Sequence, residues 1–147
     1  MEKAKFIPVA IFLFVTLFTA KADRDRPVRF EQLPDNSKEF IRKHFSEENV
    51  SFVKKDIDFL SASYEVFLVD GSKVEFDGKG EWEKVECVNR KIPDGIVPGK
   101  IVEYVEKSHP GLVIVKIERD RRDYEIELNN DLEIKFDMRF NVTGYDD

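Results

Sequence analysis

The stretch YEVFLVDGSKVEFD, residues 64–77, decides the fold, because residues 124–137 repeat it as YEIELNNDLEIKFD. An ungapped shift of 60 superimposes the two stretches. Self-similarity at a fixed period indicates two copies of one supersecondary unit. We therefore expect two repeats, over about residues 31–88 and 90–147. From Ile41 onward the same shift aligns Val53 with Val113 and Ile57 with Ile117, and Leu33-Pro34 matches Ile92-Pro93 after one residue of slip.

Strand and turn signals divide each copy into four short strands. Side chains within residues 64–69 alternate between two faces, with the period of two that is typical of a β-strand. Asp70-Gly71 follows and favours a tight hairpin with positive φ, and Asn130-Asp131 stands at the same place in the second copy. The predicted strands are residues 51–58, 63–70, 72–77 and 81–88, then 112–118, 123–129, 132–137 and 141–145.

Each copy is expected to begin with a helix, over about residues 35–46 and 96–108, because apolar side chains recur there at helical spacing. Tight hairpins make neighbouring strands antiparallel, and each helix must cover the apolar face of its sheet. The predicted fold class is α+β: two tandem α-β4 repeats in two layers, each an antiparallel sheet covered on one face by a helix. The two sheets either lie side by side or join into one curved sheet, with both helices on the same side. The expected inward side chains are Phe40, Ile41, Phe45, Tyr64, Val66, Leu68, Val74 and Phe76, then Ile101, Val105, Tyr124, Ile126, Leu128, Ile134 and Phe136.

Residues 1–22 are interpreted as a secretory signal peptide. Two lysines precede an apolar run at residues 6–20, and a small-x-small pattern places cleavage between Ala22 and Asp23. A retained membrane span is the rival interpretation, but this run is shorter than the ~20 apolar residues that a spanning helix needs. Residues 23–147 then form a single domain, preceded by a flexible leader at residues 23–30.

The composition excludes some partners. The chain has a formal net charge of −6, so it repels nucleic acids and anionic lipid surfaces, and we expect neither nucleic-acid binding nor a membrane span after processing. Cys87 is the only cysteine, so no disulfide can form within the chain, and we interpret Cys87 as a small buried apolar side chain.

These motifs together resemble the PepSY-like family of secreted bacterial proteins, which is also described as similar to beta-lactamase inhibitory protein. The resemblance implies an exported protein with a helix-on-sheet repeat, and it supplies no catalytic residue. The inhibitor analogy implies that an open sheet face grips a protein. The second copy departs from the pattern after Asp137, where the glycine turn is missing, so its last hairpin is the less secure one. The residues that carry the resemblance are Leu33-Pro34, Tyr64 to Leu68, Asp70-Gly71, Phe76 to Trp82, Ile92-Pro93, Tyr124 to Leu128 and Phe136-Asp137.

The sequence offers little material for catalysis or metal binding. Nucleophilic catalysis needs a positioned base, and the two histidines, His44 and His109, lack a companion at metal-ligand spacing. We expect His44 to pack next to the apolar stripe of its helix. We expect His109 to lie at a helix end, where a cation interacts favourably with the helix dipole. Asp77 and Asp137 are expected to start turns, and most other carboxylates to face water. The prediction is therefore no enzyme, no catalytic residues, no metal site and no cofactor.

One difference between the copies suggests a binding surface. On the sheet face away from the helix the first copy places Phe67 and Val69, where the second has Glu127 and Asn129. Trp82 joins this candidate protein-binding face if the register of the fourth strand allows it. Exposed aromatic side chains often anchor protein interfaces. The alternatives are that a loop or the leader covers Phe67, or that the two sheets pack on each other there.

The function favoured by these observations is an exported, non-enzymatic module that binds an unidentified protein or peptide of the cell envelope, such as an inhibitor of an envelope enzyme. The alternative is a small-ligand or cation-binding periplasmic carrier, which uses a groove between the repeats lined by acidic side chains.

Overall fold

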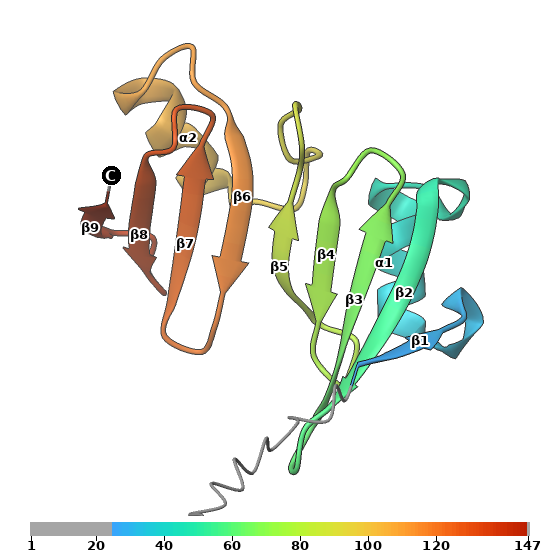
Figure 1. The fold of residues 1–147 in the computed structure, drawn as a ribbon. Coiled ribbons are helices and arrows are strands. Elements are labelled where there is room, and N and C mark those ends of the chain that lie inside the picture. Colours follow the sequence, from blue (N-terminus) through green and yellow to red (C-terminus); the bar gives the residue numbers. More distant parts are fainter. Residues whose placement is uncertain (1–24, 147) are drawn as a thin grey trace, which may run out of the picture.

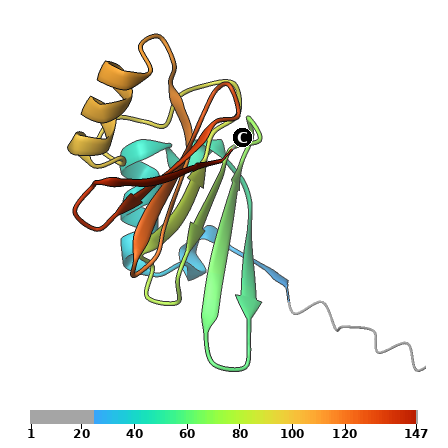
Figure 2. The same cartoon turned by 90° about the vertical axis from the view of Figure 1, so that its left-hand side faces the viewer.

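The computed structural model describes residues 25–146, which form one antiparallel sheet of nine strands with two helices on one face (Figure 1). The strands follow one another across the sheet in chain order, and the view from the side shows both helices on the same side of it (Figure 2). The predicted signal peptide and its cleavage site at Ala22 and Asp23 lie outside the described residues. The elements are β1 (Arg26–Val28), α1 (Asp35–His44), β2 (Val50–Ile57), β3 (Ala62–Leu68), β4 (Lys73–Phe76), β5 (Trp82–Glu86), α2 (Gly99–Ser108), β6 (Ile114–Arg119), β7 (Asp123–Leu128), β8 (Glu133–Asp137) and β9 (Val142–Asp146), with short 3-10 helices at Phe30–Gln32 and Glu47–Asn49.

The α+β class is correct, but the expectation of a separate four-stranded sheet in each copy is wrong. β5 pairs with β6 in antiparallel register, with Val85 opposite Ile117, and this pairing joins all strands into one sheet. An unpaired strand edge presents a row of free backbone donors and acceptors. Pairing β5 with β6 satisfies both inner edges at once. Of the two arrangements that the sequence left open, the joined sheet is the one observed.

The expected flexible leader contains a strand instead. Val28 in β1 lies opposite Val53 in β2, and the Phe30 side chain that follows is only 9% exposed. Val85 in β5 stands in the same relation to Ile117 in β6. β5 therefore has two roles. It completes the first half by pairing with β4, and it pairs with β6 in the second half as β1 pairs with β2 in the first.

The alignment by a shift of 60 is correct for β3 and β7 onward and wrong upstream. Val53 pairs with Val66, and Ile117 pairs with Ile126, so Val53 corresponds to Ile117 rather than to Val113. The helices follow this shift of 64 as well, because Pro34 and Pro98 each precede the first helical residue. The difference of four residues lies in the β2–β3 hairpin, whose strands pair over a longer stretch and project from the sheet (Figure 2).

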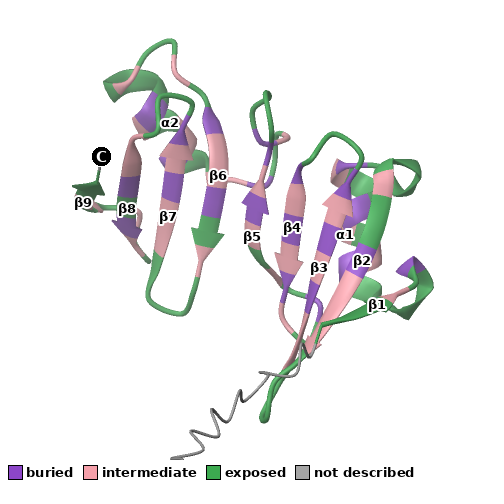
Figure 3. Ribbon diagram, viewed as in Figure 1, coloured by how far each residue is buried: buried purple, intermediate pink, exposed green. Residues whose placement is uncertain are grey.

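The core lies between the sheet and the two helices, where burial alternates along the strands (Figure 3). Of the side chains expected to point inward, Phe40 and Tyr124 are half-buried and the others are buried. Phe40 on α1 meets the edge of Phe76 with ring centroids 5.6 Å apart, and Tyr104 on α2 meets Phe136 in the same way at 5.5 Å. Burying an aliphatic or phenyl side chain of this kind contributes ~1.5–3 kcal/mol to folding.

Asp77 and Asp137 start equivalent turns, as the sequence predicts. Asp77 Oδ1 accepts hydrogen bonds from the amides of Lys79 and Glu81, both at 2.9 Å. Asp137 Oδ1 accepts from the amides of residues 139 and 141, also at 2.9 Å each. Phe140 takes the positive φ of +66° in the second turn, where Gly80 has +88° in the first. The last hairpin thus closes without the glycine, and the expectation that it is the less secure one finds no support in its hydrogen bonds.

Candidate functional site

The sheet face opposite the helices is left uncovered by the described residues (Figures 1 and 2), and we call it the open face. Strand alternation sends to this face the side chains that lie between the buried ones. Its central part carries charged side chains of only two kinds, lysine and glutamate. They are Glu65, Lys73, Glu75, Lys84, Glu86, Lys116, Glu118, Glu125, Glu127, Glu133 and Lys135.

Lysines of the open face lie among glutamates of their own strand and of other strands. Lys73 Nζ lies 2.7 Å from a Glu75 carboxylate oxygen and 3.8 Å from one of Glu65. Lys116 Nζ lies 3.3 Å from Glu127 and 3.7 Å from Glu133. Partial burial by itself lowers the pKa of Lys116, but the hydrogen bond that Lys116 donates to Glu127 and the surrounding carboxylates raise that pKa above its usual value. These lysines therefore stay charged across the physiological range.

An aromatic pair lies on the open face at its β2–β3 end. The rings of Phe52 and Phe67 stack with centroids 4.3 Å apart and planes inclined by 11°. Phe52 is 45% exposed, whereas Phe67 is half-buried. The ammonium groups of Lys54 and Lys73 lie 5.4 and 5.9 Å from the centroid of the Phe67 ring. The stacked pair is thus an apolar spot beside charged side chains of the open face.

Phe67 lies where the sequence places it, and Phe52 is its unforeseen neighbour. Phe52 pairs with Phe67 in the regular register of β2 and β3, and the β-bulge comes after this pair, between Phe52 and Val50. Phe52 therefore points to the same face as Phe67. Alternation from the buried Val53 is the sequence signal that could have placed Phe52 on this face. Val69 lies just past the end of β3 and is exposed, and its amide donates to the Asn49 carbonyl at 2.8 Å.

Trp82 does not belong to the open face, and the idea that it joins Phe67 there is corrected. It pairs with Phe76 across a bulge, and its ring lies 6.3 Å from that of Phe40 on α1. The Arg119 guanidinium lies over the indole ring, 3.9 Å from its centroid, and Arg119 Nε donates to the Trp82 carbonyl at 2.8 Å. The extra residue of the bulge, Glu83, changes the alternation and turns Trp82 toward the helix layer.

The two histidines contact aromatic rings, and Cys87 is buried. His44 contacts Phe40 at 4.7 Å between ring centroids, and partial burial, followed by the charge of Lys43, lowers its pKa. His109 follows the last residue of α2 and contacts the rings of Tyr104 and Tyr145. Cys87 is buried, and that burial raises the pKa of its thiol.

The described residues contain neither a metal-ligand cluster nor a membrane-spanning helix. No group of three or more His, Cys, Asp or Glu side chains there is placed to hold a metal ion. No helix within residues 25–146 is both long and apolar enough to cross a membrane.

Comparison with known proteins places the chain in a family. Residues 62–143, more than half of the chain, match the family described as "Putative beta-lactamase-inhibitor-like, PepSY-like". The chain belongs to this PepSY-like family. No protein with a curated description matches it.

Three solved structures from Bacteroides share the fold. One from Bacteroides vulgatus, described as a "putative periplasmic protein" of the DUF2874 family, is 43% identical with a TM-score of 0.82, over 86% of this chain and 99% of that chain. One from Bacteroides thetaiotaomicron, described as a "putative calcium-regulated periplasmic protein", is 44% identical with a TM-score of 0.82 and the same coverage. A second Bacteroides vulgatus protein, described as of unknown function, is 38% identical with a TM-score of 0.79, over 84% of this chain and 99% of that chain.

Proposed function

We propose that the chain is an exported, non-enzymatic module that binds a protein or peptide of the cell envelope through its open face. Residues 1–22 serve as the signal peptide that is cleaved between Ala22 and Asp23, and the mature protein works in the periplasm. The proposal is supported by the periplasmic descriptions of the similar structures and by the inhibitor-like description of the family. The single observation that carries it is the exposed Phe52–Phe67 stack on a broad uncovered sheet.

The open face has the ingredients of a protein interface. A stacked aromatic pair offers a rigid apolar anchor, and such anchors supply much of the binding energy in protein complexes. The surrounding lysines and glutamates offer charged donors and acceptors on alternate positions, which favour a partner with complementary charges and give specificity. The partner contributes an apolar side chain over Phe52 and Phe67 and polar groups around it. An inhibitor of an envelope enzyme is one form of this function.

The test is capture of a partner from envelope extract by the immobilised protein, followed by an activity assay on any enriched hydrolase. Phe67→Glu copies the residue that the second half has at the corresponding position, Glu127. Because Phe67 contacts the open-face side chains Phe52, Lys54 and Lys73, this variant should keep its fold. We expect capture to fall at least about tenfold, the loss of one anchor residue.

The matched control is Glu127→Gln, which changes the open face in the other half without touching the aromatic pair. It should capture the partner as the unchanged protein does. Equal capture by the Phe67→Glu and unchanged proteins, both folded by circular dichroism, contradicts the proposal. Inhibition of the captured enzyme by the pure protein would define the inhibitor form.

A second candidate function is the small-ligand or cation-binding carrier. It is favoured by the description of the Bacteroides thetaiotaomicron protein as calcium-regulated. Thermal unfolding with and without millimolar Ca²⁺, with Mg²⁺ as the control ion, separates the two candidates. A specific rise of the melting temperature with Ca²⁺ favours the carrier.

A further inference from the structure

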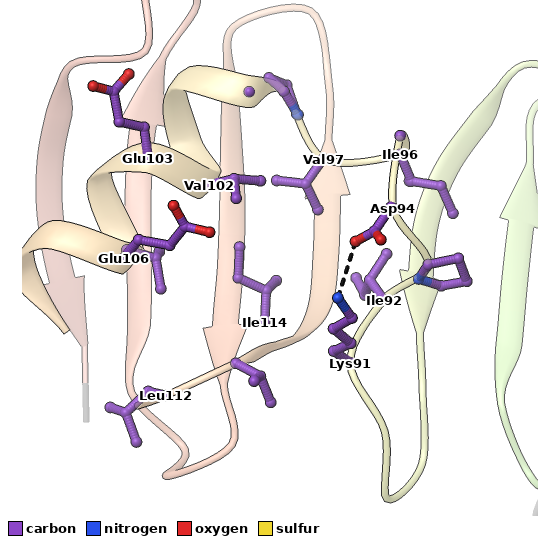
Figure 4. Close-up of a pocket in the computed structure, with 16 residues that line it drawn as sticks. Lys91, Ile92, Asp94, Ile96, Val97, Val102, Glu103, Glu106, Leu112 and Ile114 are labelled. Carbon is purple, nitrogen blue, oxygen red and sulfur yellow. Dashed lines mark hydrogen bonds and ion pairs between the residues drawn. The ribbon is translucent and has the colours of Figure 1, made fainter. Parts of the chain in front are cut away.

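A groove lies on the helix side of the molecule, between α2 and the segment at residues 91–98 that leads into it (Figure 4). Its volume is about 700 Å³, within the range of small-ligand sites. Val102 on α2 and Val97 on the segment point toward each other, above Ile92 and Ile114 (Figure 4). The groove is apart from the open face, which lies on the other side of the sheet.

The first half of the molecule shows what fills the corresponding place. There the connection from β1 to α1 is short, and it lays the Phe30 ring beside α1. The Arg42 guanidinium covers that ring at 5.4 Å from its centroid. By the shift of 64 that relates the two helices, Glu106 occupies the position of Arg42. The second half therefore has a carboxylate where the first has a cation above an aromatic ring.

The longer connection from β5 to α2 brings no aromatic ring into the groove. Residues 87–98 connect these elements and supply aliphatic side chains, of which Ile92 and Ile96 are buried and Val97 is half-buried. The groove therefore has apolar walls, but no aromatic residue lines it in the place that Phe30 occupies in the first half.

The rim of the groove has an excess of negative charge. Lys91 Nζ is held 3.0 Å from Asp94 Oδ1, and Lys107 Nζ lies 2.6 Å from Glu103 Oε1. Among the described residues, Glu106 has no cation within ion-pair distance, and its exposed carboxylate borders the groove. An occupant with an apolar side chain and an adjacent cation matches both the walls and the rim.

We propose that this groove binds a short basic peptide segment, with an aromatic or branched apolar side chain between its walls and a flanking arginine or lysine on Glu106 and Glu103. The occupant supplies in trans the combination that Phe30 and Arg42 supply within the first half. This site is independent of the open face, so one can fail while the other holds.

The probe is the capped peptide Ac-Arg-Phe-Leu-Arg-NH2, titrated into the folded ¹⁵N-labelled protein residues 23–147 and followed by NMR. We expect the largest amide shifts at Val97, Val102 and Ile114. Glu106→Lys should weaken binding about fivefold, the upper range for one exposed ion pair, and raising the salt concentration should weaken it further. Val102→Phe, which fills the groove without changing its charge, should weaken binding at least about tenfold.

The matched control is Glu39→Lys, the same charge change at an exposed position of α1, and it should leave the affinity within about twofold. Equal binding of Ac-Glu-Phe-Leu-Glu-NH2 or Ac-Gln-Phe-Leu-Gln-NH2 overturns the basic class of ligand. Shifts confined to the open face, or no saturable shift at all, overturn the site. A dimer in sedimentation that Val102→Phe dissociates assigns the groove to a second copy of the chain and also overturns the proposal.

Discussion

At the scale of single residues, two positions fix the turn that follows β4. Gly80 has a φ of +88°, and a Cβ atom built on it would lie 2.7 Å from the Pro34 side chain and 2.9 Å from Ser37 Oγ. The same Ser37 hydroxyl donates to the Gly80 carbonyl at 3.2 Å, where both residues are buried. This turn is therefore packed directly on the start of α1, and its glycine is required by space as well as by backbone angle.

Replacing Gly80 by alanine should destabilise the protein by about 1–3 kcal/mol, because a non-glycine residue is strained at this φ and its methyl group meets α1. Urea unfolding followed by circular dichroism measures the change. Gly99→Ala is the matched control, because Gly99 is helical and has open space around it, so we expect a gain of about 0.4–1 kcal/mol there. Equal effects of the two substitutions would contradict this account.

Asp137 makes the last hairpin sensitive to acid. Hydrogen bonds from the Asn141 amide and side chain, and then from the Arg139 amide, lower the pKa of the Asp137 carboxyl below its ordinary value of 3.8. A carboxyl group with a lowered folded-state pKa stabilises the fold above its unfolded value, and this contribution is lost as the pH falls through the folded value. Asp137→Asn keeps the oxygen acceptor but not the charge.

We therefore expect Asp137→Asn to unfold more easily than the unchanged protein at pH 7 and to differ less from it at pH 3, because pH 3 lies below the ordinary value of 3.8 and the contribution of the charge is already partly lost there. Urea midpoints at the two pH values test this. A stability difference that stays the same at both pH values would show that the charge of Asp137 has no part in the turn.

At the scale of elements, the β2–β3 hairpin differs most from its counterpart. This hairpin is four residues longer than the β6–β7 hairpin because its two strands pair further before the turn, and its tip exposes Phe59 by 89% and Leu60 by 91%. Surface turns tolerate insertions because few contacts depend on them. The projecting tip therefore has little part in the stability of the sheet.

Replacing Phe59 and Leu60 together by serine should change the free energy of unfolding by no more than about 0.5 kcal/mol, the range of surface substitutions. Ile134→Ala, at a fully buried site in β8, should cost about 2–5 kcal/mol in the same urea assay. A large loss from the double serine variant would reveal a packing role for the tip that its exposure does not suggest.

The sequence predicts some elements better than others for physical reasons. Alternation of apolar residues located β3, β4, β7 and β8, because each has one buried face and a compact turn. It missed β1, because three residues that include a proline form a strand only when β2 offers an edge. The position of Trp82 depends on a bulge, which is set by pairing with β4 and leaves no local pattern. The face of Phe67 follows from alternation, whereas its contact with Phe52 follows only from the register of β2 on β3.

At the scale of the whole molecule, β5 makes the two halves dependent on each other. Besides the pairing of Val85 with Ile117, the Cys87 amide donates to the Val115 carbonyl at 2.8 Å. Without β5, the β6 edge loses these partners and Ile117 loses a buried neighbour. A second half that begins after β5 therefore lacks a strand that it needs.

A fragment of residues 80–147, which keeps β5, should fold, whereas a fragment of residues 90–147 should remain unfolded. Small domains have little stability to spare, so the loss of one paired strand is decisive. Circular dichroism and amide dispersion in NMR spectra distinguish the two states. Folding of the shorter fragment, or failure of both, would contradict the role assigned to β5.

The strand order also determines how the molecule responds to mechanical force. Because neighbours in the sheet are neighbours in the chain, with β1 at one margin and β9 at the other, a pull on either end loads a single outer strand. A protease or secretion motor that grips an end therefore meets the strands of the sheet one at a time, in chain order.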